Sequence, residues 1–67
     1  MKITLNNNPE TFAENELTIA EIIQKKNFTF KMLVTKLNGK VVLKDDRTAT
    51  TVKDGDDLTV LHLVSGG

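Results

Sequence analysis

The chain has 67 residues, of which 39% are hydrophobic and 27% charged, and its nine basic and nine acidic side chains give a formal net charge of zero. This composition is typical of one small folded domain, and the balanced charge argues against nucleic acid as a partner. Without cysteine, the chain has no disulfide, thiol nucleophile or thiolate metal ligand. Its apolar runs are too short to cross a bilayer and its first residues do not read as a signal peptide, so we expect a cytoplasmic protein without a membrane partner.

The first 13 residues predict a β-hairpin. Ile3 and Leu5 alternate with polar residues, as they do on a half-buried strand. Residues 6–9 predict the turn, because Asn tolerates left-handed backbone angles and Pro fixes φ. Residues 10–13 would then form the second strand.

The clearest helix signal follows this hairpin. Thr18 is placed as an N-cap, and Glu21 three residues later completes a capping box, so the helix should begin at Ile19. We expect Glu21 and Lys25 to form an i, i+4 ion pair on its outer side. The inward stripe has i, i+3, i+4 spacing and consists of Ile19, Ile22 and Ile23.

A second hairpin is predicted where the β-prone runs 32–37 and 40–43 flank Asn38-Gly39. Both turn residues tolerate the positive φ that a two-residue hairpin turn requires. Residues 44–50 predict a loop with room for one helical turn. Asp54-Gly55-Asp56 predicts a further turn, and these carboxylates lack the spacing of a calcium loop, so we predict no metal site there.

The last predicted strand lies in the apolar run 58–64. Strand alternation places Leu58 and Val60 on one face and Leu61 and Leu63 on the other. If the first pair fills the core, the second pair faces solvent, and we predict that Leu61 and Leu63 dock a partner. His62 is the only histidine, so we predict a surface or packing role for it rather than a catalytic or metal-binding one.

The chain ends on Ser65-Gly66-Gly67. Because glycine has no Cβ, such a tail fits a channel that is too narrow for other residues. The terminal carboxylate of Gly67 has an unperturbed pKa of about 3.3 to 3.7 and is therefore a ready oxygen nucleophile at neutral pH. We divide the chain into a domain at 1–64 and a flexible diglycine tail at 65–67.

Together these elements predict an α+β fold in which a mixed four- to five-stranded sheet packs on one main helix. Their order, with Asp54-Gly55-Asp56 before an apolar strand and a terminal Gly66-Gly67, resembles the ubiquitin-like β-grasp sulfur carriers, and most closely the ThiS family. The resemblance covers essentially the whole chain. Two positions depart from the family pattern: Lys26, where an apolar residue is more common, and Ser65, where alanine is common.

The resemblance implies that the chain is a protein co-substrate rather than an enzyme, with no catalytic residue, cofactor or metal of its own. A ThiF-type enzyme would use ATP and magnesium to adenylate the carboxylate of Gly67. Sulfur from a donor such as a cysteine desulfurase would convert the adenylate to a thiocarboxylate. A ThiG-type thiazole synthase would receive this sulfur during thiamine thiazole synthesis, and Gly66 would give the partners access to the tail.

Three alternatives share the same features. The small subunit of molybdopterin synthase is typically longer and often carries prolines before its tail, whereas this chain has one proline, at position 9. A ubiquitin-like protein modifier would use the same adenylation, so the tail does not separate it from a sulfur carrier. A plain β-grasp interaction module with an incidental diglycine is the third alternative.

Overall fold

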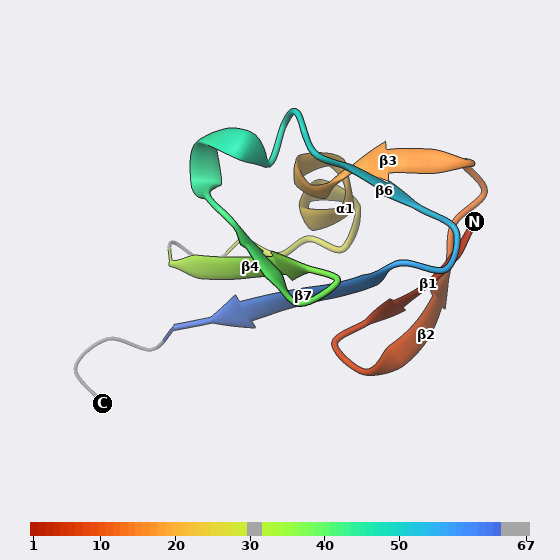
Figure 1. Ribbon diagram of the computed structural model, residues 1–67, viewed down its shortest axis with the longest axis horizontal. Helices are drawn as coiled ribbons and strands as arrows, with labels where there is room; N and C mark the ends of the chain where they lie inside the picture. Colours follow the sequence, from red (N-terminus) through yellow and green to blue (C-terminus); the bar gives the residue numbers. More distant parts are fainter. Residues whose placement is uncertain (30–31, 64–67) are drawn as a thin grey trace.

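The fold is that of a computed structural model, and the structure describes residues 1–29 and 32–63 (Figure 1). Its helical elements are α1, Ile19–Lys25, and a short 3-10 turn, η1, Lys44–Asp46. The strands are β1 (Lys2–Leu5), β2 (Asn8–Thr11), β3 (Glu16–Thr18), β4 (Leu33–Leu37), β5 (Lys40–Val42), β6 (Thr51–Lys53) and β7 (Asp57–His62). In the described part of the chain, no helix is long and apolar enough to cross a membrane.

The main sheet has five strands in the order β2-β1-β7-β4-β5. β7 pairs in parallel with β1 and antiparallel with β4, while both hairpins are antiparallel. The sheet is therefore mixed and packs on one helix, which confirms the predicted α+β, β-grasp architecture. The last strand of the chain, β7, occupies the centre of the sheet (Figure 1).

Both predicted hairpins form, and each closes through two residues with positive φ. The second turn is the predicted Asn38-Gly39, with φ of 52° and 84°. The first turn is shorter than predicted, because Asn6 and Asn7, with φ of 50° and 67°, reverse the chain by themselves. β2 therefore begins at Asn8 and already includes Pro9.

Pro9 fits inside β2 for two reasons. β2 is an edge strand, so only one of its sides must supply hydrogen bonds. The register also places Pro9 opposite Thr4, one position beyond the pair Leu5–Asn8 that closes the hairpin. In an antiparallel ladder alternate residues turn their peptide groups outward, so the nitrogen of Pro9 faces away from β1.

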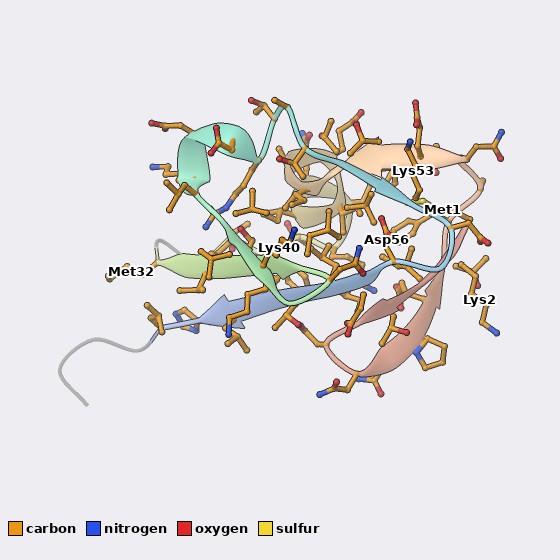
Figure 2. All side chains as sticks on the ribbon, in the orientation of Figure 1. Met1, Lys2, Met32, Lys40, Lys53 and Asp56 are labelled. Atoms are coloured by element: carbon orange, nitrogen blue, oxygen red, sulfur yellow. The ribbon has the colours of Figure 1, made fainter. Side chains whose placement is uncertain are left out.

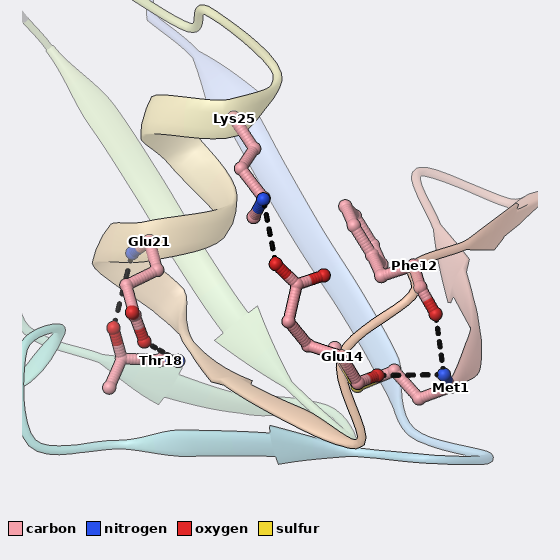
Figure 3. Close-up of polar contacts among 6 residues, drawn as sticks. All are labelled: Met1, Phe12, Glu14, Thr18, Glu21 and Lys25. Carbon is pink, nitrogen blue, oxygen red and sulfur yellow. Dashed lines mark hydrogen bonds and ion pairs between the residues drawn. The ribbon is translucent and has the colours of Figure 1, made fainter.

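Helix α1 begins at Ile19, as predicted, and the capping box is complete (Figure 3). The Glu21 amide donates to Thr18 Oγ1 at 3.1 Å, and Glu21 Oε1 accepts from the Thr18 amide at 2.8 Å. The predicted ion pair between Glu21 and Lys25 is wrong, because this capping bond holds the Glu21 carboxylate at the start of the helix. Lys25 Nζ instead lies 2.8 Å from a carboxylate oxygen of Glu14.

The core lies between α1 and one face of the main sheet. Its buried apolar residues are Ile3, Leu5, Leu17, Ile19, Ile22, Val52, Leu58 and Val60. Leu58 and Val60 thus confirm the predicted inward face of the last strand. Lys26, at a position where an apolar residue was expected, is the C-cap of α1 and forms an ion pair with Glu10 at the margin of the core.

The two-stranded sheet of β3 and β6 was not predicted. Each strand has three residues, which is too short for an alternation signal, and Leu17 pairs with Val52 across a long stretch of sequence. This small sheet brackets the start of α1, where the amide of Ile19 donates to the carbonyl of Thr50 at 3.0 Å. It therefore fixes how the helix enters the core.

Candidate functional site

The tail-bearing strand β7 is held firmly at its start. The Asn38 side chain joins the two turns at this end of the sheet: its Nδ2 donates to Asp56 Oδ1 at 3.1 Å, and its Oδ1 accepts from the Asp57 amide at 2.9 Å. Asp56 Oδ2 accepts from the Lys53 amide, and Asp54 Oδ1 accepts from the Lys2 amide. These carboxylates build a turn, as predicted, and the described residues contain no cluster of metal-ligating side chains.

The far end of β7 leads toward the tail. The amide of Leu63 donates to the carbonyl of Met32 at 3.0 Å, so the ladder between β4 and β7 continues one residue beyond His62. The predicted reacting residue Gly67 and its neighbour Gly66 lie outside the described residues. Their roles, and the division of the chain into 1–64 and 65–67, therefore stay predictions.

Two leucines of this end face solvent as predicted. Leu61 is 47% exposed and Leu63 is 46% exposed, whereas Leu58 on the opposite face is fully buried. Strand alternation explains the contrast, because α1 covers only one face of the sheet. The exposure is confirmed, and the docking role of Leu61 and Leu63 stays a prediction.

The structure extends this apolar surface across two more strands. The register places Val34 opposite Leu61, and the hydrogen bond from Leu63 places Met32 opposite that leucine. Directly opposed residues of an antiparallel pair project on the same face. We use the term open face for five apolar residues on this side of β4, β5 and β7: the exposed Met32, Val41, Leu61 and Leu63, and the half-buried Val34.

The sequence did not predict that the open face extends over β4 and β5. Met32 is 53% exposed and Val41 is 60% exposed. Met32 lies at the same end of the molecule as the last described residues of β7 (Figure 2). Alternation within the predicted hairpin could have indicated Val41, but only the order of the strands shows that it shares a face with Leu61. Lys36, opposite Val41, adds a positive charge to this surface.

His62 is exposed at the end of β7, opposite Leu33. Among the described residues it joins no group of histidine and acidic side chains that could hold a metal ion. Its exposure agrees with the predicted surface role. The described apolar side chains at this end of β7, Leu61 and Leu63, form a solvent-exposed surface.

Comparison with protein families gives a match to the ThiS family over residues 3–67. The chain belongs to the ThiS family. It is accordingly a sulfur carrier protein of thiamine biosynthesis and not an enzyme. Membership of the ThiS family also implies adenylating and sulfur-transfer partners.

Solved structures agree with this assignment. The crystal structure of the thiamine biosynthesis protein ThiS from Geobacter metallireducens is 32% identical in sequence, with all of both chains covered and a TM-score of 0.89. A solution NMR structure of a thiamine biosynthesis protein from the same organism is also 32% identical, with all of this chain and 88% of the other covered and a TM-score of 0.82. The similarity to the crystal structure thus covers the whole length of both chains.

Proposed function

We propose that this chain carries sulfur as a thiocarboxylate on Gly67. A ThiF-type partner uses ATP and magnesium to convert the terminal carboxylate to an acyl-adenylate, with pyrophosphate as the leaving group. A persulfide donor, such as a cysteine desulfurase, attacks the adenylate with its outer sulfur, so that AMP leaves and an acyl disulfide joins Gly67 to the donor. A thiol reductant then cleaves the S–S bond with two electrons, which leaves the thiocarboxylate on Gly67 and a thiol on the donor. A ThiG-type thiazole synthase accepts the sulfur, and the carboxylate is restored.

The family match is the observation that carries this proposal, because it extends to residue 67 and so includes Gly66 and Gly67. The reaction requires only the terminal carboxylate from the chain itself. A carboxylate with an ordinary pKa is ionised at neutral pH and attacks the α-phosphate of ATP without a base of its own. The activating groups belong to the partner, in keeping with a carrier that is not an enzyme.

The open face provides the docking surface in this proposal. Leu61 and Leu63 lie on the strand that leads to the reacting end, and Met32 stands beside them. Burial of such side chains contributes roughly 25 cal/mol for each Å² of apolar surface removed from water. Docking there brings Gly67 to the partner's active site, while Lys36 favours a partner with carboxylates near its apolar contact.

Intact-protein mass spectrometry tests the proposal. The chain is incubated with ATP, magnesium, the adenylating partner, a persulfide donor and a thiol reductant, and the expected result is exchange of one oxygen for sulfur on Gly67. An adduct to a lysine of another protein would indicate a protein modifier instead. An unchanged mass would indicate a plain interaction module whose diglycine does not react.

Two variants of the tail serve as controls. Deletion of Gly67 and addition of one residue after Gly67 should each abolish the exchange, because the carboxylate no longer reaches the reacting position. Circular dichroism should show that both variants remain folded, since neither change touches the core. Normal sulfur loading of the extended chain would contradict the proposal.

A further inference from the structure

Within residues 1–29 and 32–63, one end of β4 has no paired strand on the side of β5. The register of this hairpin ends where Thr35 faces Val42. Because the Leu63 amide donates to the Met32 carbonyl, Met32 and every second residue after it turn their peptide groups toward β7. The peptide groups of Leu33 and Thr35 therefore point toward the β5 side, and Leu33 lies beyond the last pair.

The guanidinium of Arg47 occupies the place of the missing strand. Its Nη2 donates to the carbonyl of Leu33 at 2.6 Å, and its Nε donates to Thr35 Oγ1 at 3.0 Å. Thr35 is fully buried, and its hydroxyl donates in turn to the carbonyl of Val42 at 2.7 Å. One cation thus satisfies the unpaired end of β4 through a charge-assisted fork, which is stronger than a neutral hydrogen bond.

Arg47 is itself anchored by the helix. Its carbonyl accepts a hydrogen bond from the amide of Ala20 at 3.1 Å, in the first turn of α1. The same residue therefore joins the start of the helix, through its backbone, to the end of β4, through its side chain. Since the helix packs on the core, the backbone from which the guanidinium extends is anchored.

We propose that Arg47 is a positioning residue for the sulfur-carrying tail. On its other side, Leu33 faces His62, and the adjacent bond from the Leu63 amide to the Met32 carbonyl is the last of this ladder within the described residues. By fixing the end of β4, Arg47 fixes the end of β7, to which the tail is attached. The effect on the tail's chemistry rests on the proposed function, whereas the effect on the ladder does not.

The first test measures backbone hydrogen exchange by NMR in the isolated chain. In Arg47→Ala the amide of Leu63 should exchange about tenfold faster, because an unpartnered, partly buried carbonyl at Leu33 weakens the end of β4. The amide of Thr4, which donates to the carbonyl of Asp56 at the opposite end of β7, should exchange at an unchanged rate. Equal acceleration at both amides, or no change at Leu63, would overturn the proposal.

Two further variants make this measurement specific. Arg47→Lys keeps one charged donor but not the fork, so exchange at Leu63 should lie between the rates of the wild type and of Arg47→Ala. Lys44→Ala removes a cation from the neighbouring turn η1, and it should exchange as the wild type does. If Lys44→Ala accelerated exchange at Leu63 as much as Arg47→Ala does, the effect would come from loss of a positive charge. The hydrogen bonds of the Arg47 guanidinium would then not be its cause.

The second test measures adenylation kinetics with the chain as the varied substrate. Arg47→Ala should lower kcat several-fold and leave KM near the wild-type value, since the open face is intact and only the delivery of Gly67 is impaired. A raised KM with unchanged kcat would overturn the proposal, because Arg47 would then contact the partner directly. If the wild type is not adenylated, the proposed function fails, and hydrogen exchange still decides whether Arg47 fixes the end of β7.

Discussion

The two faces of β7 carry the same kind of residue with opposite consequences. Leu58 is completely buried against the core under α1, whereas Leu61, three residues later, is 47% exposed. Neither hydrophobicity nor strand propensity distinguishes them. The difference comes from the pleat of the strand and from a single helix that covers only one side of the sheet. The covered face stabilises the fold, and the open face remains available for binding.

Truncation on the covered face should have the largest effect. Leu58→Ala should lower the free energy of unfolding by about 2 to 5 kcal/mol, because it removes a buried side chain and leaves a cavity. Urea unfolding followed by circular dichroism measures this loss. The matched variant Leu61→Ala should stay within about 0.5 kcal/mol of the wild type. Equal losses in the two variants would break the contrast between the faces.

A charge on the open face should affect binding instead of stability. Leu61→Asp should weaken the complex with the adenylating partner about tenfold or more, because docking would bury an unpaired carboxylate. Isothermal titration calorimetry measures the dissociation constant. Thr11→Asp, on the exposed edge strand β2, is the control and should bind as the wild type does. An unchanged dissociation constant for Leu61→Asp would remove this leucine from the docking surface.

The smallest expected effect lies at the margin of the covered face, where Glu14 meets Lys25 (Figure 3). The hydrogen bond from Lys25 lowers the pKa of Glu14 below its usual 4.5. A lowered pKa in the folded chain means that this contribution to stability is complete above the pKa of the unfolded chain. It is lost as the pH falls through the pKa of the folded chain.

Glu14→Gln should therefore remove a small part of the acid sensitivity. At neutral pH the variant should unfold at a slightly lower urea concentration than the wild type, and the two midpoints should converge in acid. Lys25→Met removes the other partner and should give a similar pattern. A wild-type midpoint that stays above that of Glu14→Gln by the same margin at every pH would show that the ion pair contributes nothing.

The sequence predicts well those features that neighbouring residues control. Thr18 and Glu21 are three residues apart and form the capping box as predicted, since a helix start is a local structure. Asn38-Gly39 gives the expected turn because its backbone angles depend on the two residues themselves. The resemblance to sulfur carriers, drawn from the order of the motifs, predicts both the β-grasp fold and the family, and the tail as the reacting end stays a prediction.

The sequence does not predict what depends on segments that are distant along the chain. Arg47 stands in a polar loop without any motif, and its role exists only because β5 ends before β4 does. Lys25 pairs with Glu14 rather than with the expected Glu21, because the chain before the helix folds back beside it.

Local signals thus determined the helix start, the turns and the two faces of β7. Tertiary structure alone decided how far the open face extends over Met32 and Val41 and how the end of β7 is held. Backbone preferences act between adjacent residues, whereas strand order and register follow from packing the whole chain around one core.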